Sequence, residues 1–125
     1  KCPYPPALEV VYPDLKESWY KLMFKIGIDK IVGGSMSPTI KDGSFVIFFS
    51  SKKMKITPNK VYRLSHPQFG SIIKRLSFED ADGNFWFKGD SHDSTSLKKI
   101  GAITKQQING RIWLTIDIKS CITFL

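Results

Sequence analysis

SIIKRLSFEDADGNFWFK, residues 71–88, contains two apolar runs on either side of Asp82-Gly83. Asp-Gly between two runs of strand length is a strong hairpin signal, because these residues suit the backbone angles of a tight two-residue turn. We therefore expect one strand from Ser71 to Glu79 and a second from Asn84 to Lys88.

Further runs of strand length lie on both sides of this hairpin, and each is bounded by Gly, Pro, Asn or Asp. The expected strands are Asp29 to Val32, Ser44 to Ser50, Val61 to His66 and Arg111 to Ile118, with a short helical turn at Gln106 to Gly110. Six strands joined by short loops predict a mainly β domain built on a curled, partly open antiparallel sheet.

The N-terminal region has a different character. Four of the seven prolines fall within Lys1 to Pro13, which predicts an extended lead-in. Asp14 to Lys25 is the best helix candidate, because Asp14 can cap its start and apolar residues recur at helical spacing, with Gly27 near its end. We interpret it as a packing helix; the alternative is an amphipathic helix in peripheral association with a membrane. The chain then divides into residues 1–27 and a β-rich domain, residues 28–125, within one compact unit.

The composition is that of an ordinary globular domain. The chain has 125 residues, of which 42% are hydrophobic and 24% charged. These values exclude disorder and fibrous repeats, and no run of 18 apolar residues predicts a membrane span. The net charge of +8 permits an acidic partner, an anionic membrane or nucleic acid. We expect no nucleic-acid partner, because no nucleic-acid-binding motif accompanies the charge.

Cys2 and Cys121 are the only cysteines in the sequence. We interpret them as two lone thiols rather than a disulfide, because the chain is poor in cysteine. No pair of cysteines or histidines has the spacing of a zinc site, so we expect neither a metal nor a cofactor. Localisation stays open between a soluble cytoplasmic protein and a membrane-associated one.

GGSMSPTIKDG, residues 33–43, is the most informative segment for chemistry. Gly33 and Gly34 leave room for a substrate to approach Ser35, and Pro38 stiffens the turn that follows. Such a turn exposes the Ser35 hydroxyl beside its own backbone N–H, which is the minimum that an acyl-transfer site needs. Taken alone, the pattern is more often an ordinary turn.

A second informative residue lies in the first strand of the hairpin. Lys74 shares one face of this strand with Ile72 and Leu76. Burial between apolar neighbours disfavours the charged form of a lysine, and a neutral lysine can act as a general base. The alternative is that the side chain extends past its neighbours to water.

Together these segments resemble the signal peptidase I-like serine proteases. The resemblance is carried by Gly-x-Ser-Met-x-Pro-Thr-Ile from Gly33, by Ile73-Lys74-Arg75 and by Lys88-Gly89-Asp90. It runs from about Ile31 to Ile112 and is greatest to small members without a membrane helix, such as the maturation proteases of nickel superoxide dismutase. It implies a fold of the signal peptidase/LexA type with Ser35 as nucleophile and Lys74 as general base. The implied substrate is a precursor protein or peptide with small residues just before the scissile bond.

The resemblance also implies the surroundings of this dyad. The oxyanion pocket and site wall would be formed by Gly33, Gly34, Met36 and Ser94, with Pro38, Gly89 and Asp90 as structural residues of the motifs. An extended substrate would lie beside Lys30, Ile31, Val32 and Gly33 and beside Gly70, Ser71, Ile72 and Ile73. The chain departs from the family at Ser96 and Lys98, where relatives have an acidic residue and an arginine. It also departs at Gly33, where some relatives have a serine.

Three other interpretations stay open. LexA-like repressors share the serine and lysine motifs for self-cleavage, although no Ala-Gly or Cys-Gly bond occurs in this sequence. A catalytically inactive peptide-binding module is compatible with the same fold. A Ser-His-Asp triad using His66 or His92 is less favoured, because the segment around Ser35 lacks the final glycine of a nucleophile elbow.

Overall fold

Antiparallel pairing joins seven strands into one open sheet in the part of the chain that the structure describes. The computed structural model describes residues 24–51, 53–92, 97–117, 119 and 121–125. The strands are β1 (Phe24–Lys30), β2 (Phe45–Ser51), β3 (Val61–His66), β4 (Gly70–Glu79), β5 (Phe85–Lys88), β6 (Ile108–Ile116) and β7 (Ile122–Phe124). A short helix, α2 (Leu97–Ile100), and a 3-10 turn, η1 (Lys105–Gln107), precede β6. The predicted mainly β class, with an open antiparallel sheet, is confirmed.

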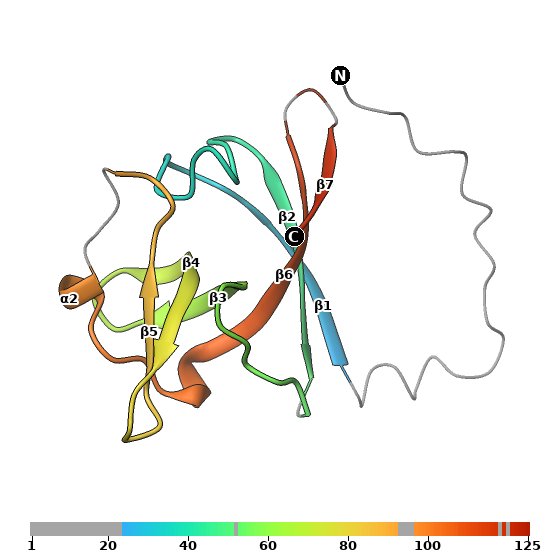
Figure 1. Cartoon of the computed structure of the whole chain (residues 1–125). Helices are drawn as coiled ribbons and strands as arrows, with labels where there is room; N and C mark the ends of the chain where they lie inside the picture. The colour runs from blue at the N-terminus through green and yellow to red at the C-terminus, as the bar shows by residue number, and fades with distance from the viewer. Residues whose placement is uncertain (1–23, 52, 93–96, 118, 120) are drawn as a thin grey trace, which may run out of the picture.

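The strand order is β1-β2-β6-β3-β4-β5, and β7 pairs with β6. Figure 1 shows β3, β4 and β5 at one end of the curled sheet and β1, β2 and β7 at the other, with β6 running through both parts. The curl brings β1 close to β3, although two strands separate them in the sheet, and Asp29 of β1 forms an ion pair with Arg63 of β3. Residues from both ends of the sheet therefore meet on its concave side.

The hairpin between β4 and β5 forms as predicted, but its turn runs from Asp80 to Gly83 and is longer than the expected two-residue turn. Gly83 has a φ of 81°, a left-handed conformation that glycine adopts without strain. The Asp80 carboxylate accepts hydrogen bonds from the backbone N–H groups of Asp82 and Asn84 and from the indole of Trp86. The turn is thus held by a side chain that precedes it as well as by its glycine.

Two apolar clusters pack against opposite faces of β3, since Tyr62 and Leu64 belong to the first and Val61 belongs to the second. The first packs Tyr62 and Leu64 of β3 against Phe87 of β5 and against Ile100 of α2. The second contains Met36, Ile40, Val46, Val61 and Ile112. Met36 and Ile40 belong to the loop between β1 and β2, so this loop is anchored in the core rather than lying free on the surface.

The predicted strands agree with the structure except at the two ends of the described chain. Strands β2 to β5 lie within one residue of their expected bounds. β6 begins at Ile108, so the helical turn expected at Gln106 to Gly110 is wrong for its last three residues, and only η1 is helical there. The three-residue strand β7 and the four-residue helix α2 were not predicted, because elements this short leave no periodic pattern.

The prediction for the region before the serine loop is wrong where the structure tests it. Residues 24 and 25, expected to end a helix, begin strand β1, and the strand expected at Asp29 to Val32 ends at Lys30. Gly27 lies in the middle of this strand, opposite Phe48, and does not end a helix. All seven residues of β1 pair with β2, and this tertiary pairing overrides the local helical signal. The rest of the expected helix, the lead-in and Cys2 lie outside the described residues.

The interpretation of two lone thiols is also wrong, because Cys121 is disulfide-bonded. A low cysteine count carries no information about which parts of the chain the fold brings together, and this explains the error. Among the helices that the structure describes, none combines the length and apolar character needed to cross a membrane.

Candidate active site

The loop between β1 and β2 carries Ser35 and is closed at its base by backbone hydrogen bonds. The N–H of Ile31 donates to the carbonyl of Ser44 at 2.7 Å, and the N–H of Gly43 donates to the carbonyl of Ile31 at 2.8 Å. Inside the loop, Gly33 has a φ of 94°, which explains the glycine at this position. The loop then turns through a cis Ser37-Pro38 peptide bond to the buried Ile40. Ser35 therefore lies in a loop whose two ends are hydrogen-bonded to each other and whose residues Met36 and Ile40 are buried in the core.

Lys74 lies on β4 opposite Tyr62 of β3, and its side chain is only 4% exposed. The alternative that it extends to water is therefore wrong. Burial lowers the pKa of the Lys74 amine, because the charged form loses its hydration. Among the described residues, the amine has no hydrogen-bond or ion-pair partner that would offset this loss. A lysine in this setting loses its proton more readily than an exposed lysine does.

Ser35 and Lys74 line the same cavity, which has a volume of about 320 Å³. Nine of the residues predicted for the site contribute to its wall: Lys30, Ile31, Val32, Ser35, Met36, Ser71, Ile72, Ile73 and Lys74. Gly33, Gly34 and Gly70 are not among the lining residues, and Gly70 instead begins β4 with a φ of 72°. Ser94 and Ser96 lie outside the described residues, and Lys98 is exposed on α2.

The backbone around Ser35 contains N–H groups that could face a developing oxyanion. The N–H of Gly33 is not one of them, because it donates to the Asp42 carboxylate at 2.9 Å. The N–H groups of Gly34 and Ser35 have no acceptor within the described part of the chain. A Cβ added at Gly34 would meet no atom within 4 Å, so the fold itself does not require glycine there.

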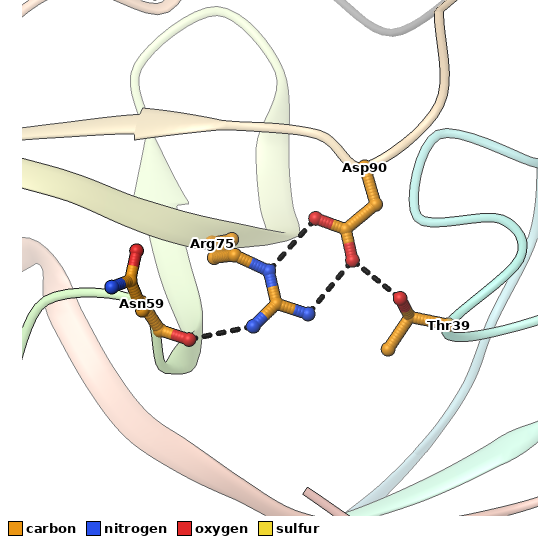
Figure 2. A network of polar contacts seen from close by, with 4 residues as sticks. All are labelled: Thr39, Asn59, Arg75 and Asp90. Carbon is orange, nitrogen blue, oxygen red and sulfur yellow. Dashed lines mark hydrogen bonds and ion pairs between the residues drawn. The ribbon is translucent and has the colours of Figure 1, made fainter.

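A polar network fixes the serine loop to the strand that carries the lysine. The Arg75 guanidinium donates to both carboxylate oxygens of Asp90, each at 2.8 Å, and to the carbonyl of Asn59 at 2.6 Å. Thr39, four residues after Ser35, donates its hydroxyl to the same carboxylate at 2.5 Å. Figure 2 shows Asp90 between the arginine and the threonine. In addition, the backbone N–H of Ser91 donates to the carbonyl of Ser35 at 3.0 Å.

This network also shifts the ionisation of its members. The hydrogen bonds from Arg75 lower the pKa of the Asp90 carboxyl, and the bond to Asp90 raises the pKa of the Arg75 guanidinium. Both groups are consequently charged at neutral pH. The Asp90 carboxylate thus joins the segment after β5 to Thr39 of the serine loop and to Arg75 of β4.

Sequence reasoning missed two features of this site. The Asp90 motif and Arg75 were noted, but not the bond between them, because the predicted hairpin brings the two segments together without indicating which of their side chains will bond. The ion pair between Asp29 and Arg63 also lines the cavity and was not anticipated. The sequence shows only two opposite charges on strands that are far apart in the chain. Such pairs are too common to predict an ion pair.

The histidines have other places in the structure. His66 is bound at the turn between β3 and β4, where its Nδ1 accepts from the N–H groups of Gln68 and Phe69 and its Nε2 lies 2.7 Å from the carbonyl of Ile100. His92 is exposed, and neither histidine lines the Ser35 cavity. This arrangement offers no support for a Ser-His-Asp triad.

No family model, curated protein or solved structure matches this chain in the three comparisons made. Among the described residues, no group of three or more His, Cys, Asp or Glu side chains could hold a metal ion.

Proposed function

We propose that this chain is a serine endopeptidase of the signal peptidase I-like type, which uses a Ser35–Lys74 dyad to remove a leader or pro-segment from a precursor. The observation that carries the proposal is the setting of Lys74. Lys74 is 4% exposed and lines the cavity that Ser35 also lines, and its amine has no hydrogen-bond or ion-pair partner among the described residues. Burying an amine without a partner costs stability, so such a group is more often retained for chemistry than for the fold.

The proposed reaction is acyl transfer. Neutral Lys74 takes the proton of the Ser35 hydroxyl while Ser35 attacks the scissile carbonyl. The oxyanion that forms is stabilised by the N–H of Ser35, with that of Gly34 as a second donor. The protonated amine of Lys74 then delivers its proton to the leaving amine, and the C–N bond breaks. In the second half of the reaction, Lys74 takes a proton from water, which attacks the acyl-serine. The ester C–O bond then breaks, the new carboxyl end is released, and Lys74 returns its proton to the Ser35 oxygen.

The sheet supports an extended substrate on both sides of the cavity. Within the described residues, β1 pairs only with β2, so its other edge is open. Residues 70–74 of β4 pair with β3, whereas β5 pairs only with residues 75–79, so the second edge of this first half of β4 is open as well. Open edges bind extended peptides through main-chain hydrogen bonds. A precursor segment passing through the cavity would therefore be held in the conformation that cleavage requires.

A peptide-binding module without activity is the second candidate, because the same open edges would bind a peptide that is never cut. The LexA-like alternative also uses a serine–lysine dyad and differs in the position of the cleaved bond, which would lie within the same chain. Both alternatives predict measurable outcomes that differ from those of a peptidase acting on other proteins.

The dyad can be tested with a library of extended peptides that carry small residues at successive positions. Wild-type protein is compared with Ser35→Ala and Lys74→Met, and the matched controls are Ser50→Ala and Lys53→Met, which do not line the cavity. We expect both dyad variants to lose at least about a thousandfold in kcat/KM, because members of a catalytic unit fail together. The controls should retain activity.

The other outcomes are equally informative. Binding of peptides by wild-type protein without cleavage would favour the inactive module. Loss of mass from the purified chain itself, abolished by Ser35→Ala, would favour self-cleavage. Cleavage of library peptides that survives both dyad substitutions would disprove the dyad.

A further inference from the structure

Arg63 occupies an unusual place for a charged residue, in the wall of the cavity that Ser35 and Lys74 line. It lies on β3, opposite Ile73 of β4. Its Nε donates to the Asp29 carboxylate, and its side chain is 22% exposed. The two terminal nitrogens of the guanidinium have no acceptor among the described residues. Four N–H donors of a residue that lines the cavity are therefore without a partner among the described residues.

The guanidinium is held in a fixed position. Its central carbon lies 4.9 Å from the centre of the Phe48 ring, which is a cation–π distance. Phe48 in turn lies against Gly27 of β1, where an added Cβ would come within 2.2 Å of the ring. Because the ring and Asp29 fix the arginine from two directions, little conformational entropy remains to be lost when its free nitrogens bind a ligand.

The charges around the cavity favour an anionic group. The lining residues include one carboxylate, Asp29, which is already paired with Arg63, and two permanent cations, Arg63 and Lys30. The buried Lys74 adds no negative charge in either of its protonation states. A carboxylate that approached the free nitrogens of Arg63 would form charge-assisted, bidentate hydrogen bonds, which are the strongest class available to arginine.

We propose that Arg63 is a specificity-determining residue that binds a carboxylate of the substrate. This inference rests on the peptidase function proposed above and narrows its substrate class to extended peptides with an acidic group near the scissile bond. The carboxylate has two sources, an Asp or Glu side chain or a free C-terminus. Asp29 holds the arginine in place and competes with the substrate for its charge.

Recognition can be measured separately from cleavage. Full-length Ser35→Ala protein is titrated with a peptide that wild type cuts, or, if none is cut, with the tightest-binding library peptide. In a matched series of peptides, each of the four residues on either side of the cleaved bond, or of the middle of an uncut peptide, is replaced with Asp and, in a second peptide, with Asn. Each peptide is made with a free and with an amidated C-terminus. We expect Asp to bind about tenfold more tightly than Asn at one position, as a charge-assisted hydrogen bond predicts.

Two further substitutions in the Ser35→Ala background give effects of opposite sign. Arg63→Gln should abolish the preference for Asp over Asn, whereas Asp29→Asn should increase it, because the guanidinium is then released from its internal partner. Misfolding cannot produce both results, since it would weaken the binding of all peptides alike. A preference that follows the free C-terminus instead of a side chain would identify the second source of the carboxylate.

The inference and the function fail in different ways. Equal binding of Asp and Asn peptides at all positions, or a preference that survives Arg63→Gln, would overturn the role of Arg63 even if wild type cleaves peptides. Absence of cleavage together with an Arg63-dependent preference would leave the recognition site intact and remove the peptidase.

Discussion

At the scale of single residues, we expect Lys74 to lower the stability of the fold while it serves the proposed cleavage reaction. Its amine is buried without a partner among the described residues, so the folded state disfavours the proton that the unfolded chain accepts freely. Replacing the lysine with methionine, which has a similar length and no charge, should increase the free energy of unfolding by about 1 kcal/mol or more at pH 7. The same substitution should abolish cleavage. Urea unfolding and peptide cleavage, measured on the same preparations, test the two effects together.

The pH dependence of this effect has a definite sign. Burial lowers the pKa of Lys74 in the folded state, so between that value and the unfolded value of about 10.4 the unfolded chain binds more protons. The stability of the wild type therefore rises with pH through this window, and Lys74→Met should lack that part of the rise. The cleavage rate should increase over the same range as the amine loses its proton. Parallel stability profiles for the two proteins would contradict a buried neutral lysine.

Gly34 gives a second prediction at this scale. An added Cβ would meet no atom of the protein within 4 Å, and no positive φ is recorded for this residue. Gly34→Ala should consequently fold with almost unchanged stability. If a substrate passes over Ser35, however, the added methyl group should raise KM or lower kcat at least several-fold. An alanine variant with unchanged kinetics would show that this side of Ser35 is not used.

At the scale of elements, the Asp90 carboxylate determines how the serine loop and β4 lie relative to each other. Asp90→Asn keeps the shape but loses the charge that holds Arg75 and Thr39. We expect it to lower the free energy of unfolding by about 1–2 kcal/mol at pH 7 and to reduce kcat. Asp80→Asn is the matched control, since it removes another carboxylate with a lowered pKa from the turn between β4 and β5, whose residues do not line the cavity.

Acid titration should distinguish the Asp90 contribution from a general loss of structure. Arg75 lowers the pKa of Asp90 in the folded state. The contribution of the Asp90 carboxylate to the free energy of unfolding is therefore complete above about pH 4 and is lost as the pH falls towards the lowered pKa. The stability difference between wild type and Asp90→Asn should therefore shrink in acid. A difference that stays constant down to pH 2 would indicate that the charge is not responsible.

The elements also show which structural information is local. β2 to β5 could be predicted because each has a run of strand length between turn residues, and the Asp82-Gly83 turn fixes the register of its hairpin. β1 could not, because the helical pattern before it continues into its first residues and only its pairing with β2 makes them a strand. The residue types of the dyad were visible in the sequence, whereas the contacts that position them were not. The Asp29–Arg63 ion pair joins strands that meet only when the sheet curls, and the Arg75–Asp90 pair depends on side-chain positions beyond the end of the paired part of the hairpin.

At the scale of the whole molecule, the charge of +8 should influence how substrates arrive. A basic protein attracts an acidic peptide at low ionic strength, and salt screens this attraction beyond about 10 Å at 0.1 M. We expect kcat/KM for an acidic peptide to fall several-fold between 20 mM and 500 mM salt, while that of a neutral peptide of the same length changes little. Stopped-flow or steady-state kinetics at several salt concentrations test this. Equal salt dependence for both peptides would exclude steering by the net charge.

The position of Asp90 along the chain has a consequence for biosynthesis. Both Ser35 and Lys74 leave the ribosome before the carboxylate that ties the serine loop to Arg75, and Ser91, which binds the carbonyl of Ser35, follows immediately after it. A nascent chain that ends before residue 90 thus carries Ser35 and Lys74 without the connection between their supports. The peptidase proposed above would therefore acquire its activity only after residues 90 and 91 have been translated.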